Sequence, residues 1–412
     1  MQVVVTIDHR FYRTPCGAVW TESAFPYNFW TRYLSVFDSV RVVGRTREVD
    51  CPSEHWVRAD GPNVEFWSIP YYVGPFQYAR RCLAIKASVQ ASFAAGSAVI
   101  LRAASQISTC LVPVLEESNY PFGMEVVCDP RDVFAPEAVS GPLRIFFRWW
   151  FCKHLRKQCS LASGVAYVTQ QTLQRRYPPR HYNLAVSDVL LSPTAAPVST
   201  SYSSVALPGS AYSGSDRRIR KEPNHWTLVS VATMTQRYKG QDTLLRAARI
   251  CMEKGHALRV ILVGEGVYRR QFEELAQKLG IADSVTFTGA LPIGDKVFEV
   301  MDSADVFVHP SHADGLPRAI IEAMARGLPC IASNVGGIPE LVGPDELIPP
   351  NDPVALADAI LALLNDPLRM ARISDENSRK AHEYSDEVLA PRRKEFYEHV
   401  RSVTSEHLLQ QA

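Results

Sequence analysis

Short apolar runs alternate with longer amphipathic stretches along most of the chain. Residues 2–8 (QVVVTID), 39–45 and 97–103 are nearly continuous apolar runs, the pattern typical of strands buried in a parallel sheet. Between the last two lie a third predicted strand, 64–70, and a predicted helix, 78–93. Strands that alternate with helices indicate an open α/β sheet.

The same alternation resumes in the second half of the chain with an apolar run at 226–233 (WTLVSVAT). Further strands are predicted at 258–266, 285–292 and 304–311. The stretch 192–223 between the two halves is rich in Ser, Pro, Gly and Ala, which is typical of a linker. The pattern therefore predicts two α/β halves with a linker between them.

Composition supports this division and narrows the function. A chain of 412 residues exceeds what one hydrophobic core usually supports. With a formal net charge of +1, affinity for a membrane or a nucleic acid would need a local patch, and we predict no nucleic-acid partner. The nine cysteines include no C-x-x-C pair, which argues against a disulfide framework and a zinc site. The N-terminus lacks the features of a signal peptide, so we expect a cytoplasmic protein.

One string, HPSHADGLPRAIIEAMARGLPCIASNVGGIPEL (309–341), combines several glycines and prolines with two carboxylates. It predicts a loop, a helix that starts near Leu316 or Pro317, a buried strand and a Gly-Gly turn. The free amides of the first helical turn suit an anion, and Asp314 and Glu322 suit the hydroxyls of sugars on either side. This outlines a site for a sugar nucleotide. The alternative is an ordinary loop-helix-strand unit with solvated carboxylates.

The string resembles the signature of the retaining glycosyltransferase family four: an acid, seven residues, a Glu, then Ala-Met-Ala-x-Gly-x-Pro and a Gly-Gly-x-Pro-Glu turn. The matching residues are Asp314, Glu322, Ala323 to Ala325, Gly327, Pro329 and Gly336 to Glu340. The first acid of the family is usually Glu, and Asp314 carries the same charge on a side chain one methylene shorter. The resemblance implies the α/β GT-B fold, in which two Rossmann-like domains face a cleft.

The resemblance also implies the division of labour between the domains. Residues 1–200 would bind the acceptor, 201–223 would form the linker, and 224–389 would bind the nucleotide sugar. A C-terminal helix, 390–412, would cross back to the N-terminal domain.

Within the donor domain, the resemblance assigns the diphosphate to Lys239, at a strand-to-helix turn, as a point charge. The family usually adds an Arg five residues earlier. This chain has Met234 there by direct count, or Thr233 if the loop is one residue longer, and Arg237 is the candidate for a second charge. The amides of Gly315 and Leu316 would also hold the diphosphate.

The two carboxylates of the motif take separate roles in the resembled family. Glu322 would accept hydrogen bonds from the ribose, and Asp314 would hold hydroxyls of the transferred sugar. Transfer would keep the anomeric configuration. The sequence has no Asp-x-Asp pair to hold a metal-bound diphosphate, so we expect neither a metal nor another cofactor.

Other positions are candidates for the rest of the site. Gly264 and Gly266 form a Gly-x-Gly turn that would approach the donor nucleotide, and Arg269 stands where a dinucleotide fingerprint needs a third glycine. Gly17 lies in the loop after the first strand, on the acceptor side. Asp129, after a strand that begins at residue 124, matches a catalytic strand-end acid of the family, or belongs to a simple Asp-Pro turn.

The helix predicted within 141–160 mixes bulky aromatic and basic residues. This composition is typical of a helix at a membrane interface, so peripheral contact with the inner membrane surface is one interpretation. A helix that covers the sheet with its cationic stems packed along its flank would show a similar pattern.

These observations predict a retaining, metal-independent glycosyltransferase of polysaccharide biosynthesis. It would move a sugar from a nucleotide-sugar donor, which family frequency favours as a UDP-sugar, to a glycan, a lipid-linked or a small-molecule acceptor. The alternatives on the same fold are a sugar-nucleotide epimerase, a phosphorylase, and a non-catalytic protein that binds sugar nucleotides.

Overall fold

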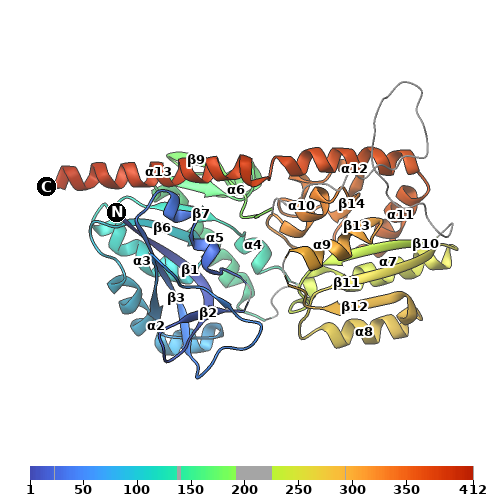
Figure 1. Cartoon of the computed structure of the whole chain (residues 1–412), viewed down its shortest axis with the longest axis horizontal. Helices are drawn as coiled ribbons and strands as arrows, with labels where there is room; N and C mark the ends of the chain where they lie inside the picture. The colour runs from blue at the N-terminus through green and yellow to red at the C-terminus, as the bar shows by residue number, and fades with distance from the viewer. Residues whose placement is uncertain (23, 137–140, 192–224, 293, 412) are drawn as a thin grey trace. The chain divides into compact units, whose positions relative to one another are not determined.

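The computed structural model describes the chain apart from residues 23, 137–140, 192–224, 293 and 412. Its contacts divide the chain into two compact units (Figure 1). Unit 1 comprises Met1–Pro130, Ile145–Ser187 and Leu389–Ala412, and unit 2 comprises Arg131–Arg144 and Asp188–Val388. The predicted linker, 201–223, lies outside the described residues.

Unit 1 is built on a mainly parallel sheet. Its strands are, in chain order, β1 (Gln2–Arg13), β2 (Val19–Thr21), β3 (Ser39–Glu48), β4 (Val57–Arg58), β5 (Val64–Ile69), β6 (Ala98–Ala103), β7 (Gly123–Val126), β8 (Gly164–Tyr167) and β9 (Tyr182–Ala185). The parallel strands lie in the order β5, β3, β1, β6, β7, β8, β9, and β2 and β4 add an antiparallel extension. The chain builds outward from β1 and then returns to β6, which is the doubly wound order.

The helices of unit 1 connect these strands. They are α1 (Tyr27–Trp30), α2 (Gly74–Ala91), α3 (Gln106–Glu117), α5 (Arg144–Leu161), α6 (Thr172–Arg176) and most of α13 (Asp386–Gln411). The short α4 (Pro130–Val133) follows β7 and belongs to unit 2 from Arg131 onward. Local chemistry explains where some of them start. The Ser105 hydroxyl, for example, accepts hydrogen bonds from the amides of Ile107 and Ser108 and so caps α3.

Unit 2 contains a sheet of six parallel strands in the order β12, β11, β10, β13, β14, β15. The strands are β10 (His225–Val231), β11 (Ala257–Val263), β12 (Val285–Gly289), β13 (Val306–His309), β14 (Cys330–Ser333) and β15 (Leu347–Ile348). Its helices are α7 (Gln241–Glu253), α8 (Arg269–Lys278), α9 (Asp295–Asp302), α10 (Arg318–Ala325), α11 (Pro353–Leu364) and α12 (Pro367–His382). The order reverses between β10 and β13, and ligands of such sheets bind outside the carboxyl ends of the strands at this point.

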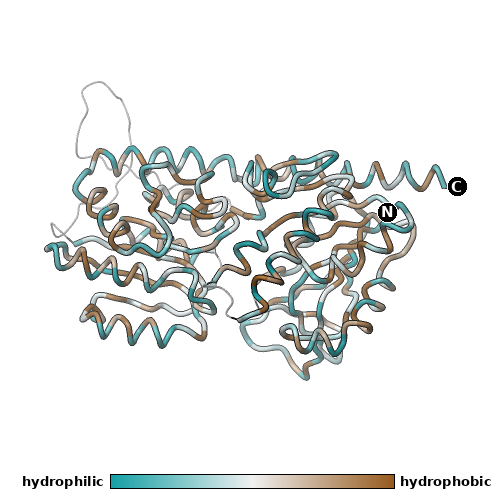
Figure 2. Tube along the Cα trace, turned by 180° about the vertical axis from the view of Figure 1, so that it is seen from behind, coloured by the Kyte–Doolittle hydropathy of each residue, from teal (hydrophilic) through white to brown (hydrophobic). Residues whose placement is uncertain are grey.

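Each unit has its own hydrophobic core, formed by the strands and the inner faces of the helices. In Figure 2 the colour alternates between teal and brown along the outer helices, as expected for helices with one buried face. Two large aromatic side chains, Trp30 and Tyr33, are fully buried in the core of unit 1. Two doubly wound sheets with separate cores agree with the predicted Rossmann-like architecture.

The C-terminal helix α13 completes the core of unit 1. Its residues Phe396, Tyr397 and Val400 are buried with the residues of the first strands. Gly123, at the start of β7, makes this approach possible, because a Cβ atom there would lie 2.5 Å from a methyl carbon of Val400.

A buried polar network also joins α13 to the sheet of unit 1. The Glu125 carboxylate pairs with Arg102 and accepts hydrogen bonds from the hydroxyls of Tyr33, at 2.8 Å, and Tyr397, at 3.1 Å. A buried charge is tolerated when its hydrogen-bonding positions are filled in this way.

The first strand differs from its prediction. The sequence predicts a strand that ends at residue 8 and a loop that follows it, whereas β1 continues to Arg13 and turns back through a hairpin into β2. The buried side chains of Phe11 and Tyr12 explain the extension, together with pairing of residues 10–13 with β3. The predicted open loop is therefore wrong over residues 9–13.

Candidate functional site

The loop between β13 and α10 carries unpaired backbone amides. α10 begins at Arg318, and Pro317 is its N-cap residue with an extended ψ of 116°. The predicted start at Leu316 or Pro317 is therefore one or two residues early. Within the described part of the chain, the amides of Gly315 and Leu316 donate no hydrogen bond. Free amides beside the positive end of a helix dipole suit an anion.

Three side chains meet directly before this helix. Lys239 Nζ, from the turn η3 (Arg237–Lys239), lies 2.7 Å from Asp314 Oδ2. His309 Nε2, at the end of β13, lies 2.9 Å from the same oxygen. The side chains of Lys239 and Asp314 are 16% and 13% exposed, and that of His309 is 3% exposed. Lys239 therefore lies beside the start of α10, which is the placement that the predicted diphosphate site requires.

The charges of this cluster support one another. Burial would raise the pKa of Asp314, but the ammonium of Lys239 and the hydrogen bond from His309 outweigh burial and hold this pKa well below its usual range. Burial would likewise lower the pKa of Lys239, but Asp314 raises it, with smaller contributions from Tyr238 and Asp132. At neutral pH the site therefore contains a carboxylate anion and an ammonium cation.

Two glycines allow the loops of this region to approach one another. Gly336 has a left-handed φ of +54°, and a Cβ atom there would lie 1.6 Å from the backbone oxygen of Asp314. Gly240, with φ +77°, would place a Cβ atom 2.0 Å from the backbone oxygen of Pro310. No side chain fits at either position, so both glycines are required for the local geometry.

Glu322 lies one turn into α10. Burial raises the pKa of its carboxyl, and the nearby charge of Arg318 opposes this effect. Among the described residues, its side chain accepts no hydrogen bond. A partly buried carboxylate with open acceptor positions is compatible with the predicted contact to ribose hydroxyls, which stays a prediction.

The second predicted cation has a different environment. Arg237 is exposed in η3 and forms no ion pair with a described residue. Met234, which stands where the resembled family usually has Arg, is fully buried in the core of unit 2. The structure therefore pairs Lys239 with Asp314, and among the described residues it shows no ion pair between Arg237 and Asp314.

Sequence reasoning missed two residues of this region. His309 is a polar residue at the end of an apolar strand, five positions before Asp314. A polar side chain at such a strand end could have indicated a site residue. Asp132, in α4, belongs to unit 2 by its contacts, and its Oδ2 lies 3.3 Å from the Cβ position at Gly336. Nothing in the sequence links Asp132 to Lys239, although its charge contributes to the raised pKa of that lysine.

The Gly-x-Gly turn after β11 packs against the loop after β10. A Cβ atom at Gly264 would lie 2.1 Å from the oxygen of Ala232, and one at Gly266 would lie 2.1 Å from the carbonyl carbon of Met234. The close packing of these two loops is thus one reason why glycine is required at both positions. Their contact with a nucleotide stays a prediction.

The two candidates of the N-terminal half lie in unit 1. Gly17 occupies the tight β1–β2 turn with φ +85°, and its amide donates to the oxygen of Thr14 at 2.8 Å. Asp129 is 1% exposed, and its two oxygens accept hydrogen bonds from Tyr177 and Arg176. The neighbours of Asp129 thus satisfy both oxygens, and its catalytic role stays a prediction.

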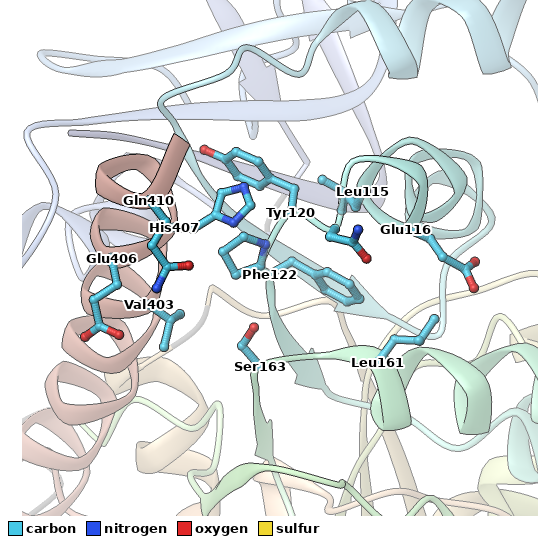
Figure 3. A pocket seen from close by; sticks show the side chains of 12 residues that line it. Leu115, Glu116, Tyr120, Phe122, Leu161, Ser163, Val403, Glu406, His407 and Gln410 are labelled. Atoms are coloured by element: carbon cyan, nitrogen blue, oxygen red, sulfur yellow. The ribbon is translucent and has the colours of Figure 1, made fainter. Parts of the chain in front are cut away.

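A cavity of about 300 Å³ in unit 1 lies elsewhere (Figure 3). The ends of α3 and α5 and the last turns of α13 line it, together with Tyr120 and Phe122 of the loop before β7. Phe122 and Ser163 directly precede β7 and β8, so the cavity lies at the amino-terminal edge of the sheet. Ligands of doubly wound sheets bind at the opposite edge, so the cavity is separate from the candidate site.

Curated relatives share sequence with both parts of this chain. Protein CapJ of Staphylococcus aureus is 23% identical over 358 residues, which cover 86% of this chain and 83% of CapJ. The putative colanic acid biosynthesis glycosyltransferase WcaL of Escherichia coli is 32% identical over 186 residues, which cover 42% of this chain and 45% of WcaL.

Solved structures agree in fold over nearly the whole chain. Sucrose-phosphate synthase from Thermosynechococcus elongatus superimposes with a TM-score of 0.71 at 19% identity and covers 98% of this chain and 99% of that chain. Anabaena Alr3699/HepE in complex with UDP and glucose has a TM-score of 0.60 at 17% identity, with the same coverage of both chains. At these identities the likeness shows the fold, and it confirms the predicted two-domain GT-B architecture.

A family model covers the part of the chain that holds the candidate site. Residues 215–381, which include Lys239, Asp314 and Glu322, match the model of the glycosyl transferases group 1. The resemblance first drawn from the motif is thereby confirmed, and so is the prediction that the protein is a glycosyltransferase. This region of the chain belongs to the glycosyl transferases group 1 family.

Proposed function

We propose that this protein transfers a sugar from a UDP-sugar to a glycan, a lipid-linked or a small-molecule acceptor in polysaccharide biosynthesis. One observation carries the proposal: Lys239 lies 2.7 Å from Asp314, directly before a helix whose neighbouring amides at Gly315 and Leu316 are free. A cation, free amides and a carboxylate are the groups that a sugar diphosphate needs.

The donor would bind across the start of α10. The diphosphate would contact the ammonium of Lys239 and the amides of Gly315 and Leu316, where the helix dipole also favours negative charge. Asp314 would accept a hydrogen bond from the transferred sugar, and Glu322 would accept one from the ribose. Glu322→Ala should then weaken binding of UDP about tenfold in a titration, since one charged hydrogen bond is lost.

The same groups would stabilise the leaving nucleotide. As the bond between the sugar and the diphosphate breaks, negative charge grows on the diphosphate, and Lys239 lies where it can offset this charge. We propose that transfer therefore needs no divalent metal and keeps the anomeric configuration, as the family resemblance implies. Turnover in excess EDTA should equal turnover in Mg²⁺, and a strict need for a metal would contradict this part of the proposal.

Two similar proteins support the choice of donor and pathway. WcaL is named as a putative colanic acid biosynthesis glycosyltransferase, and HepE was crystallised with UDP and glucose. A direct test is a thermal-shift panel of nucleoside diphosphate sugars, because a ligand bound only by the folded protein raises the melting temperature. We expect the largest shift with a UDP-sugar. Consumption of that donor without any acceptor, with release of an isomerised donor, would instead indicate an epimerase.

We also propose that unit 1 contacts the inner membrane surface through α5 from the cytoplasmic side. The side chains of Ile145, Phe146 and Trp149 are 69%, 49% and 53% exposed, and the cationic Lys153 lies over the Trp149 ring at 5.0 Å from its centroid. No helix in the described residues is long and apolar enough to cross a bilayer. Exposed apolar groups beside cations suit an anionic lipid surface.

Flotation with vesicles tests this contact. The protein should float with vesicles of phosphatidylcholine and phosphatidylglycerol, and Trp149→Ser should reduce the floating fraction severalfold. Val267→Ser, at another exposed apolar position (79% exposed) in unit 2, is the matched control. Equal flotation of both variants would contradict the role of α5.

A further inference from the structure

His309 is the last residue of β13, and its side chain is held tightly. Its backbone pairs with β14 opposite Ala332, its side chain is 3% exposed, and its ring lies nearly parallel to that of Phe307, at an interplanar angle of 8°. A side chain that is buried to this extent has little rotational freedom. The position of its Nε2 atom is therefore fixed by the sheet.

Nε2 of His309 donates to Asp314. The two atoms Nε2 and Oδ2 are 2.9 Å apart, and an ionised carboxylate is an acceptor without a proton to give. The hydrogen therefore resides on Nε2. The Asp314 carboxyl is ionised because its pKa is held well below its usual range.

The two partners of Asp314 share one of its oxygens. Lys239 Nζ and His309 Nε2 both bind Oδ2, while Oδ1 accepts no hydrogen bond from the described residues. This differs from a saturated structural carboxylate such as Asp129, whose two oxygens are both taken. One oxygen of Asp314 is anchored, and the other is left for a ligand.

The two anchors differ in stiffness and in their other tasks. Lys239 reaches Oδ2 on a flexible four-carbon stem, and in the proposed function its ammonium must also contact the diphosphate. His309 has two rotatable bonds, is enclosed by the core and has no such second task. When the diphosphate of a bound donor contacts Lys239, the hydrogen bond from His309 still holds Asp314 in place.

We propose that His309 is a positioning residue for sugar transfer: its Nε2 hydrogen bond anchors Oδ2 of Asp314, so that Oδ1 accepts a hydrogen bond from a hydroxyl of the transferred sugar. The inference rests on the proposed function and deepens it. It also gives a reason for the tolerance of Asp at a position where Glu is usual in the resembled family, because a shorter side chain fixed at one oxygen presents the other in a defined direction.

Two substitutions separate this role from simple core packing. In His309→Gln the terminal amide nitrogen reaches about as far from the backbone as Nε2 and can still donate to Asp314. In His309→Asn the amide nitrogen reaches as far as Nδ1 and falls short. His309→Phe keeps the ring but removes the donor. All three change the core, so a role limited to packing would not favour Gln over Asn.

The experiment measures two quantities for the full-length wild type and each variant. The first is the affinity for UDP by calorimetry, and the second is kcat and KM for the UDP-sugar that wild type turns over. We expect kcat/KM to fall at least about tenfold in His309→Asn and His309→Phe and to stay within about threefold in His309→Gln. Affinity for UDP, which lacks the sugar, should stay within about threefold in all of them.

Each outcome is informative. If Gln and Asn reduce kcat/KM equally, or if UDP affinity falls as much as kcat/KM, His309 does not act through Asp314 on the sugar and the inference is overturned. If His309→Phe fails to fold, the comparison of Gln with Asn still decides. Absence of turnover by wild type with every nucleotide sugar would overturn the proposed function itself, which distinguishes that failure from failure of the inference.

Discussion

Asp129 and Asp314 look alike in sequence, and their surroundings differ. Each follows a buried strand, and each pairs with a cation within its own unit. Asp129 in unit 1 is 1% exposed and uses both oxygens to hold Arg176 and Tyr177. Asp314 in unit 2 receives both of its partners on one oxygen.

This difference separates a structural ion pair from a candidate binding site. Removing both charges from water is costly, and a saturated pair such as that of Asp129 recovers the cost within the fold. The pair of Lys239 and Asp314 keeps an open acceptor oxygen and a partly exposed ammonium, and free amides lie beside it. Such a pair can still bind a ligand. The useful question for a buried carboxylate is therefore which of its hydrogen-bonding positions remain open.

The largest expected effect comes from the turn that packs on Asp314. Gly336→Ala would place a Cβ atom 1.6 Å from the Asp314 oxygen, so the loop must move. We expect the free energy of unfolding to fall by more than about 3 kcal/mol and transfer to become undetectable. Urea denaturation and a transfer assay measure both.

A matched control for that substitution exists in the same unit. Gly255 is exposed and also has a left-handed φ, but no atom lies within 4 Å of its Cβ position. Gly255→Ala should therefore cost about 1 kcal/mol from backbone strain alone and leave transfer unchanged. Equal losses for the two variants would show that the close packing of the motif loops is unimportant.

The next effect is on chemistry. Lys239→Ala removes the ammonium proposed to neutralise the diphosphate, and we expect kcat/KM to fall roughly 10²- to 10³-fold. Steady-state kinetics with the preferred donor measure this change. Lys254→Ala is the control, because Lys254 pairs with Asp358 on the surface of the same unit. A loss smaller than about threefold for Lys239→Ala would remove the basis of the proposed donor site.

The comparison of the two aspartates can be tested directly. Asp129→Asn breaks a buried pair and should lower the free energy of unfolding by about 2 to 3 kcal/mol, since Arg176 is itself 31% exposed. Asp314→Asn should reduce kcat/KM at least about tenfold with a smaller loss of stability. Paired denaturation and kinetic measurements check both. If Asp129→Asn instead keeps its stability and loses activity, Asp129 is catalytic, which is one of the two interpretations that the sequence left open.

The smallest effect is a pH dependence in unit 1. Burial is the main cause that lowers the pKa of His9 from 6.5 to about 4, with Arg45 as a further cause. Between these values the unfolded chain takes up a proton that the folded protein does not. The free energy of unfolding should therefore fall by about 2 kcal/mol as the pH drops from 6.5 to 4.

Variants isolate the contribution of His9 from that of other titrating groups. His9→Gln should flatten the decline in stability over this pH window, measured by urea denaturation at several pH values. His382→Gln, at an exposed position, should leave the decline unchanged. A wild-type slope in His9→Gln would assign the decline to other residues.

Much of the local geometry of the candidate site could be predicted from the sequence because the backbone constraints there are local. Gly336 is recognisable in the motif because no other residue fits its loop, and Pro317 marks the start of α10 to within a residue. Lys239 lies beside Asp314 because both follow strands whose carboxyl ends meet at one edge of the sheet.

The residues that escaped prediction depend on contacts distant in sequence. Whether Asp129 is open or saturated depends on Arg176 and Tyr177, and nothing near Asp129 in the sequence reveals them. The approach of Asp132 to Gly336 joins segments from opposite halves of the chain. The extension of β1 beyond residue 8 depends on pairing with β3, a tertiary effect that overrides the polar character of residues 8–10.

The packing of α13 also has a consequence for biosynthesis. Phe396, Tyr397 and Val400 fill the core of unit 1 together with the first strands, so this core stays incomplete until α13 has left the ribosome. A nascent chain halted shortly before residue 396 would display an apolar surface that the finished protein never shows. A stop codon directly before residue 396 should therefore be as damaging as a much earlier one.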